Sequence, residues 1–280
     1  MAPLGIIAGL GELPVQIASA AIERGQGVYI LRMKGFDEPA LADFPGEVVG
    51  IAELGKAFKA LKKAGTEEIC FAGIVKRPDF NALKPDMKGM TLLPKAIAAA
   101  RQGDDALLRF MIDVFEREGF KVIGAEEAAK ALTGQAGLLA GEMPSETQMQ
   151  DLRKAADVAL QMGQLDIGQG AIVANGLVLC VEAQEGTDKM LQRCADLPLE
   201  IRGTADSRIG VLVKRPKPGQ ERRIDLPTIG LNTIELAAAA GLAGIGFEAG
   251  GALILNATQI KDRAEALGLF LYGFEKDGPV

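Results

Sequence analysis

The sequence predicts an α/β protein built from two domains, the first with a parallel sheet and the second α+β with a mixed sheet. Short apolar runs alternate with helix-patterned segments through the first half. This alternation indicates a parallel sheet with helices on both faces. In the second half the dipeptide Asn175-Gly176 separates two apolar runs, which is a strong β-hairpin signal. With 280 residues, the chain is long enough for two domains of ordinary size.

The first half opens with a strand, a glycine turn and a helix. A strand over 4–8 precedes Gly9-Leu10-Gly11-Glu12, and a helix is expected from 14 to 23. This order is Rossmann-like and directs the turn and the helix N-terminus at a phosphate. The dinucleotide fingerprint is imperfect, because Pro14 replaces the third glycine and Arg32, not an acid, follows the strand over 27–31. We therefore predict a nucleotide or phosphate site that does not bind NAD. A tight turn that needs small residues is the alternative.

The rest of the first half continues the alternation. Helices are expected over 52–63, 92–101, 104–118 and 126–132, and strands over 68–75 and 120–123. Lys76-Arg77-Pro78 follows the strand over 68–75, at the end where open α/β sheets bind ligands. Gly73 inside that strand indicates a close backbone approach. We assign 1–134 to the Rossmann-like N-terminal domain, the weakly patterned 135–145 to a linker and 146–280 to the α+β catalytic domain.

The second half mixes hairpins with helices. Helices are expected over 146–162, 188–194, 233–240 and 256–267, and strands over 171–174, 177–181, 210–213, 242–247, 252–255 and 269–274. Thr187 is placed to cap the helix over 188–194. Acids, including Asp188, gather at the helix start. They would coordinate a metal or orient a substrate hydroxyl, or would simply favour the first helical turn through its dipole.

A second Lys-Arg-Pro triplet begins a cationic stretch. Lys214-Arg215-Pro216 ends the strand over 210–213, and five cations lie within 214–223, shortly before Asp225. Lys and Arg suit an anionic substrate, while a carboxylate suits a metal or a water molecule. A solvated basic hairpin with a neighbour-paired Asp is the alternative.

Composition excludes several chemistries. The chain has no His, so catalysis by a Ser-His-Asp triad and His-ligated metal sites are excluded. A metal site would be mainly oxygen, which favours Mg²⁺ or Mn²⁺. The net charge of −6 argues against nucleic-acid binding. No signal peptide or transmembrane run is expected, and the three scattered cysteines fit a reducing cytoplasm.

Several short sequence words identify a family resemblance. In order along the chain they are Ala8-Gly9-Leu10-Gly11-Glu12-Leu13-Pro14, Ala72-Gly73-Ile74-Val75-Lys76-Arg77-Pro78, Val181-Glu182-Ala183-Gln184-Glu185-Gly186-Thr187-Asp188, Val213-Lys214 and Ile224-Asp225-Leu226-Pro227-Thr228-Ile229-Gly230. Each word is weakly specific and the set is specific. The chain resembles the LpxI-type UDP-2,3-diacylglucosamine pyrophosphatases of lipid A biosynthesis.

The resemblance implies a metal-dependent hydrolase with a substrate chamber between two domains. The implied products are 2,3-diacylglucosamine 1-phosphate (lipid X) and UMP, and the implied location is cytoplasmic, peripheral at the inner membrane. It also implies that Asp225 is the catalytic acid. A nucleotide-sugar oxidoreductase and a non-enzymatic lipid or nucleotide carrier are the rival hypotheses.

Motif chemistry then assigns the remaining site residues. Asp225 would bind Mg²⁺ or Mn²⁺ or accept the proton of water, with Asp188 as a second metal ligand. The predicted substrate-binding residues are Gly11, Glu12, Gly73, Arg77, Thr187 and Lys214, of which Arg77 and Lys214 would hold the diphosphate and Gly11 and Glu12 the nucleotide or sugar. The expected partners are a lipid-linked UDP-sugar and a membrane surface, and a homodimer is allowed. The acidic overall charge predicts weak, lipid-driven docking.

Overall fold

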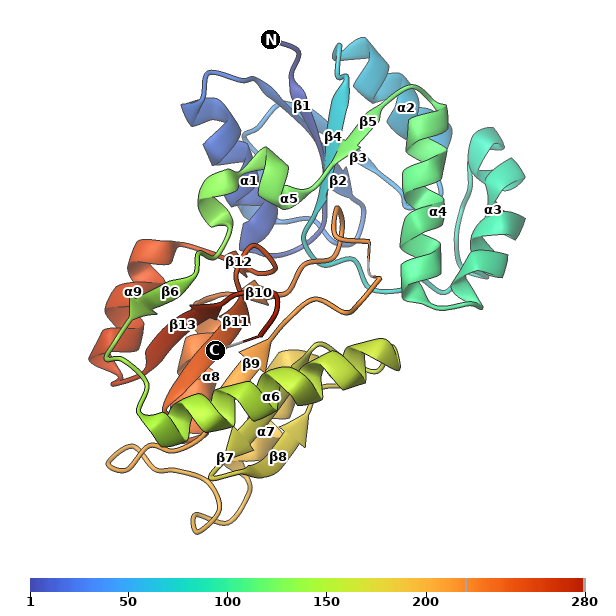
Figure 1. Ribbon diagram of the computed structural model, residues 1–280. Coiled ribbons are helices and arrows are strands. Elements are labelled where there is room, and N and C mark those ends of the chain that lie inside the picture. The colour runs from blue at the N-terminus through green and yellow to red at the C-terminus, as the bar shows by residue number, and fades with distance from the viewer. Residues whose placement is uncertain (220, 279–280) are drawn as a thin grey trace. The chain divides into compact units, whose positions relative to one another are not determined.

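The computed structural model describes residues 1–219 and 221–278, which form two compact units. Unit 1 comprises Met1–Ala131 and Glu221–Asp225, and unit 2 comprises Leu132–Gln220 and Leu226–Val280 (Figure 1). Five residues from the second half of the chain therefore pack with the first unit. A division into two consecutive ranges, as the sequence suggested, does not include such an excursion.

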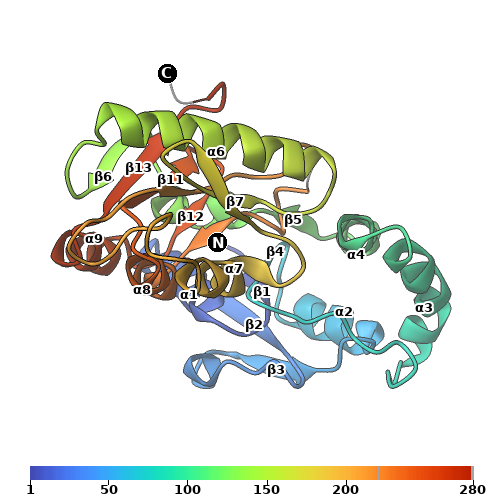
Figure 2. The same cartoon turned by 90° about the horizontal axis from the view of Figure 1, so that it is seen from below.

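Unit 1 is a five-stranded parallel sheet in the order β3-β2-β1-β4-β5, with helices on both faces (Figures 1 and 2). Its elements are β1 (Leu4–Ala8), α1 (Glu12–Glu23), β2 (Val28–Met33), η1 (Pro39–Leu41), β3 (Gly46–Val49), α2 (Leu54–Lys63), β4 (Glu68–Ala72), α3 (Met87–Ala100), α4 (Asp104–Arg117), β5 (Lys121–Ile123), α5 (Ala125–Ala128) and η2 (Lys130–Leu132). The predicted Rossmann-like order is confirmed. Successive strands are added toward one edge of the sheet from β1 to β3 and toward the other edge from β4 to β5. The boundary between β1 and β4 is therefore the switch point at which such sheets bind ligands.

Unit 2 holds a six-stranded mixed sheet in the order β6-β13-β11-β9-β7-β8 and a separate two-stranded pair, β10-β12. Its elements are β6 (Gly137–Ala140), α6 (Glu146–Gln164), β7 (Gly170–Ala174), β8 (Leu177–Val181), α7 (Gly186–Ala195), β9 (Val211–Lys214), β10 (Thr228–Ile229), α8 (Leu231–Ala239), β11 (Gly244–Glu248), β12 (Leu253–Ile254), α9 (Ala257–Ala266) and β13 (Phe270–Phe274). The predicted α+β mixed-sheet class and the Asn175-Gly176 hairpin of β7 and β8 are confirmed.

Several local predictions are wrong. The range 135–145, interpreted as a linker, contains β6, which pairs antiparallel with β13. Strands β3 and β10 were not predicted, because β3 presents no buried alternation and β10 has two residues. The strand expected over 68–75 ends at Ala72, since Gly73 takes a positive φ of 86°.

Aliphatic packing supports both units. In unit 1, α2 and α4 cover one face of the sheet, and Phe58, Phe115 and Phe120 pack together there. In unit 2, α6 covers one face and α7, α8 and α9 pack on the other. Cys70 and Cys180 are buried core residues. None of the helices in the described part of the chain combines the length and the apolar character needed to cross a bilayer.

Candidate functional site

An apolar pocket of about 480 Å³ lies within unit 1. The ends of β1, β2 and β4 form its floor, and the inner faces of α3 and α4 form its wall. Its volume is in the range of about 300–1,000 Å³ that is usual for small-molecule sites. The charged side chains that line it are Lys76, Arg77, Asp104 and Asp225. An apolar cavity with two cations and two carboxylates at its lining suits a ligand with a lipid part and an anionic part.

The loops after β1 and β4 hold each other at the switch point. Gly9 N–H donates to the Ala72 carbonyl at 2.9 Å, and Leu10 and Ile74 exchange two backbone hydrogen bonds at 3.0 and 2.8 Å. A Cβ on Gly73 would lie 2.7 Å from the Leu10 carbonyl oxygen. The close backbone approach predicted for Gly73 is confirmed, and Gly73 lines the pocket.

The glycine turn before α1 is used differently from the expectation for a phosphate loop. Gly11 has a φ of 99° and precedes the first helical residue, Glu12. Its N–H donates to the Glu38 carboxylate at 3.0 Å. The Glu38 carboxylate therefore occupies the Gly11 N–H, which is one of the donors that a ligand phosphate would use. The substrate role predicted for Gly11 and Glu12 stays a prediction and would require that Glu38 move from this donor.

Arg77 lies where two helix ends meet. Its guanidinium donates to the Ala100 carbonyl at 2.6 Å and to the Asp104 carboxylate at 3.2 Å. Ala100 ends α3 and Asp104 begins α4, so a cation here matches the dipole at the end of α3. The side chain of Arg77 is half exposed, so part of its fork faces the solvent side of the pocket.

Asp225 reaches the pocket because residues 221–225 are anchored on α4. The N–H of Glu221 donates to the Asp105 carboxylate at 2.9 Å, and Arg223 donates to the Glu116 carboxylate at 2.7 Å. Ile224 packs against the unit 1 core and lines the pocket with Asp225. Two polar contacts and one apolar contact thus fix the residue that precedes the predicted catalytic acid.

Electrostatics strengthens this anchor. The Glu221 carboxylate accepts two hydrogen bonds from the Arg223 guanidinium, at 2.9 and 3.0 Å. This pairing lowers the pKa of Glu221 below its ordinary value, and the same hydrogen bonds raise the pKa of Arg223. Since both groups are charged at neutral pH, a bidentate ion pair between Glu221 and Arg223 stabilises the turn that carries Asp225.

In unit 2, the second Lys-Arg-Pro triplet is buried. The Lys214 ammonium donates to the Thr228 carbonyl at 2.9 Å. Arg215 donates to the Glu248 carboxylate at 2.9 Å and to the Lys276 carbonyl at 3.2 Å. Arg215 is therefore a structural ion-pair residue, whereas the diphosphate role of Lys214 stays a prediction.

The acidic start of α7 also belongs to unit 2. The predicted N-cap Thr187 is wrong, because α7 begins at Gly186 with Glu185 at the cap position. Thr187 instead donates to the Glu182 carboxylate at 3.1 Å. The other Glu182 oxygen is buried and accepts no hydrogen bond from the described residues. Asp188 accepts a hydrogen bond from the Asn232 amide at 2.8 Å.

The predicted site residues therefore divide between the units. Unit 1 holds Gly11, Glu12, Gly73, Arg77 and Asp225, of which the last three line one pocket, and unit 2 holds Thr187, Asp188 and Lys214.

A divalent metal bound in unit 1 would have to share its coordination with a substrate. Among residues 1–219 and 221–278, no three Cys, Asp or Glu side chains are grouped so that they could hold a metal ion by themselves. Mg²⁺ needs only one or two protein carboxylates when substrate phosphates and water complete its shell. Asp104 and Asp225 both line the pocket and supply such oxygens. The metal assignment of Asp225 and Asp188 stays a prediction.

Sequence reasoning missed the residues that position the site. Arg223 donates to Glu116, 107 residues away in the sequence, and also to its near neighbour Glu221. The local signal was present only as one acid next to two cations in Glu221-Arg222-Arg223. No short-range pattern indicates that such a segment returns to the other unit.

Comparisons with known proteins agree with this two-unit organisation. Residues 3–132 match the family model described as the LpxI N-terminal domain, and residues 135–272 match the LpxI C-terminal domain. The protein named UDP-2,3-diacylglucosamine pyrophosphatase LpxI from Caulobacter vibrioides is 53% identical over 275 residues, which is 98% of each chain.

Proposed function

The chain belongs to the LpxI family, and from that premise we propose that it hydrolyses UDP-2,3-diacylglucosamine in lipid A biosynthesis. One observation carries the proposal from the structure: Asp225 and Arg77 line a pocket whose remaining wall is almost entirely apolar. A nucleotide diphosphate linked to a diacylated sugar has the matching chemistry, with a charged centre and two hydrocarbon chains.

We assign the cleavage to the sugar-side phosphorus. A water oxygen forms the new bond to that phosphorus, and the phosphoanhydride bond to the bridging oxygen breaks. The bridging oxygen leaves with UMP, and the lipid product is 2,3-diacylglucosamine 1-phosphate. Both steps increase negative charge on phosphate oxygens, so cations directed at those oxygens lower the barrier.

The proposed site residues supply the parts that this reaction needs. Arg77 presents donors to non-bridging oxygens, and Lys214 is the further cation that the sequence words suggest. Asp225 orients the attacking water and accepts its proton, or holds Mg²⁺ or Mn²⁺, with Asp188 as the second acid. A bound divalent ion would neutralise phosphate charge and lower the pKa of a coordinated water. Gly11, Glu12, Gly73 and Thr187 are the remaining proposed substrate contacts.

The acyl chains are assigned to the apolar pocket. Leu92, Leu93 and Ala96 of α3 line it, with Leu107 and Met111 of α4 on the next wall. Each buried methylene contributes roughly 0.8 kcal/mol. A chain of ordinary length in this pocket would therefore supply most of the binding free energy, and the charged groups would set the orientation.

The test is the substitution Asp225→Asn, with Asp113→Asn as the matched control. Asp113 is an exposed acid on α4 that does not line the pocket. UMP release from UDP-2,3-diacylglucosamine in detergent micelles with Mg²⁺ should fall at least about 100-fold in the first variant, because general acid–base catalysis is worth about 10²–10⁴. It should be unchanged in the second.

Binding and metal dependence complete the test. The Asp225→Asn variant should still bind substrate, because the apolar pocket and Arg77 remain. EDTA should stop UMP release by the unmodified protein, and added Mg²⁺ should restore it. Absence of UMP from the unmodified protein with Mg²⁺ would reject the hydrolase assignment, and full activity of Asp225→Asn would reject the role of Asp225.

A further inference from the structure

The region around α3 carries a charge opposite to that of the whole chain. Residues 74–101, called here the α3 segment, contain six Lys or Arg and two Asp, a net charge of +4, whereas the chain as a whole has −6. Helix α3 itself contains no acidic residue. An acidic protein that concentrates cations in one segment presents a local attraction for anions.

The cations of the α3 segment are only partly used inside the protein. Lys88 pairs with Glu118 at 2.5 Å, and Arg77 pairs with Asp104 at 3.2 Å. Lys76, Lys84, Lys95 and Arg101 are exposed, and none forms an ion pair with the residues that the structure describes. Four cations of this segment are therefore available to a partner.

Exposed apolar side chains accompany these cations. The exposed fraction is 86% for Met87, 63% for Met90 and 63% for Ile74. Met87 and Met90 lie three positions apart on α3, so they share its outer face. A large exposed methionine pair beside lysines is the composition of a surface that inserts into the boundary of a bilayer.

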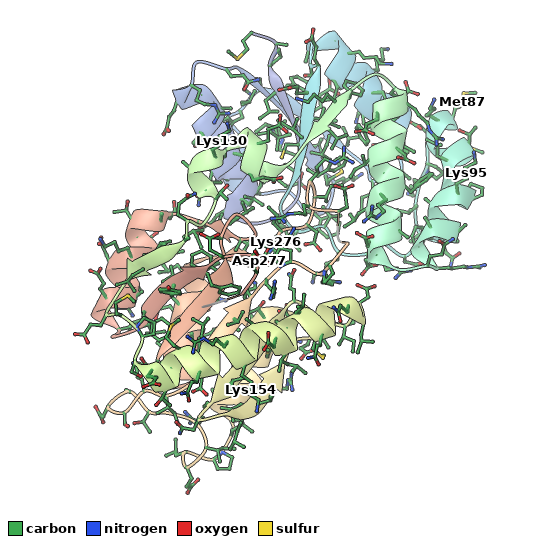
Figure 3. All side chains as sticks on the ribbon, viewed as in Figure 1. Met87, Lys95, Lys130, Lys154, Lys276 and Asp277 are labelled. Atoms are coloured by element: carbon green, nitrogen blue, oxygen red, sulfur yellow. The ribbon has the colours of Figure 1, made fainter. Side chains whose placement is uncertain are left out.

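Helix α3 presents different faces to the pocket and to the solvent. Leu92, Leu93 and Ala96 line the pocket. Figure 3 shows Met87 and Lys95 pointing away from α4, on the opposite side of the helix. Ile74 both lines the pocket and is exposed, so it marks an opening of the pocket within the α3 segment.

We propose that the α3 segment is the surface by which this protein docks on an anionic lipid bilayer, with Met87 and Met90 in the acyl boundary and Lys84, Lys95 and Arg101 at the headgroups. The proposal rests on the proposed function, because a diacylated substrate resides in a bilayer. Charge complementarity selects the partner: anionic headgroups attract the +4 segment, whereas the rest of this acidic protein is repelled. Docking here would place an apolar helix face and the opening at Ile74 next to the lipid chains.

The first experiment reverses charge on the segment. The variant Lys84→Glu/Lys95→Glu is compared with Lys59→Glu/Lys130→Glu, which changes the same net charge at exposed sites of unit 1 outside the segment. Sedimentation is measured with vesicles of phosphatidylcholine and phosphatidylglycerol, without substrate. We expect the first variant to bind at least about tenfold more weakly, since each cation near an anionic surface contributes about 1 kcal/mol. Binding of the control should fall much less.

The second experiment uses the absence of Trp from the chain. Met87→Trp introduces a single indole on α3, and Met143→Trp places a single indole at an exposed site of unit 2. The emission of Met87→Trp should shift to the blue on addition of the anionic vesicles and should be quenched by brominated acyl chains. Met143→Trp should show neither change.

Several outcomes would overturn the docking surface. They are equal loss of vesicle binding in both charge variants, no blue shift at Met87, an equal shift at Met143, or no vesicle binding by the unmodified protein. The last result would leave α3 as a surface for a protein partner. Hydrolysis in detergent micelles is measured in parallel and should be unchanged in Lys84→Glu/Lys95→Glu, so failure of docking and failure of the hydrolase assignment give different results.

Discussion

The same tripeptide, Lys-Arg-Pro, lies at the C-terminal end of an interior strand in each unit and has different surroundings in each. Lys76 and Arg77 of unit 1 are exposed, and Arg77 lines the apolar pocket. Lys214 and Arg215 of unit 2 are buried, with 5% and 6% of their surface exposed. A cationic motif at a strand end is therefore a binding group only where the fold leaves it accessible.

The difference arises from what surrounds each strand end. After β4, Gly73 turns the chain out of the sheet, so the triplet lies in a loop. In unit 2 the strand β9 continues through Lys214, and the neighbouring strand β11 supplies Glu248 to Arg215. The ring of Phe274 lies 5.7 Å from the Arg215 guanidinium. An accessible cation can attract a substrate, whereas a buried cation must be neutralised by the protein itself.

The largest effect is expected from Arg215→Met. This substitution removes the arginine partner of the buried Glu248 carboxylate, which should reduce the free energy of unfolding by about 3–5 kcal/mol. Urea unfolding measures this. Arg77→Met is the matched control in unit 1, and its half-exposed pair with Asp104 should cost only about 0–1 kcal/mol.

The double variant Arg215→Met/Glu248→Leu tests the origin of that loss. Replacement of both charges by apolar groups should recover most of the lost stability, because neither member of the pair then remains as a buried charge without the other. If Arg215→Met and Arg77→Met lowered the unfolding free energy equally, the two triplets would not differ in the way the contacts indicate.

A smaller effect is expected on catalysis from Arg77→Met. Loss of a charged hydrogen-bond donor to phosphate costs about 1.5–3 kcal/mol, so kcat/KM for UDP-2,3-diacylglucosamine should fall about 10–100-fold at nearly unchanged stability. Arg101→Met, which removes an exposed cation of the same segment outside the pocket lining, serves as the control in detergent micelles. Equal activity of the two variants would exclude Arg77 from diphosphate binding.

The smallest effect is expected on the free energy of unfolding, from a substitution in residues 221–225, the turn that carries Asp225. Since Arg223 lowers the pKa of Glu221 in the folded protein, the stabilisation by this pair is complete above the unfolded carboxyl pKa of about 4.3. It is lost as the pH falls through the lower folded value. Glu221→Gln should therefore cost about 1 kcal/mol near neutral pH, and the deficit relative to the unmodified protein should disappear in acid.

Urea unfolding at a series of pH values measures this deficit. Glu235→Gln is the control, because Glu235 also pairs with an arginine, Arg263, but in open solvent. Its deficit should be smaller and should decrease with added salt. A deficit for Glu221→Gln that does not change with pH would show that the ion pair with Arg223 is not its origin.

Local pattern was sufficient for most of the secondary structure. The Asn175-Gly176 turn predicted the hairpin, and Gly73 predicted a close backbone approach. Where local pattern was weak the predictions were wrong. The short β6 lies in a glycine-rich stretch and is a strand because β13 offers it an edge to pair with. Thr187 was predicted to be the N-cap of α7, but Glu185 occupies that position. The Thr187 hydroxyl instead donates to the Glu182 carboxylate.

Sequence alone was sufficient to establish the alternation of strands and helices, the absence of imidazole chemistry and, through short words in a fixed order, the family. These properties depend on residue identity and on neighbours a few positions apart. Three properties became evident only from the tertiary structure. One Lys-Arg-Pro triplet is accessible and the other is buried, and the Glu38 carboxylate accepts the Gly11 N–H. Residues 221–225 pack on α4, so that Asp225 lines the pocket of unit 1. These properties depend on contacts between residues far apart in the chain, and burial and ion pairing are consequences of such contacts.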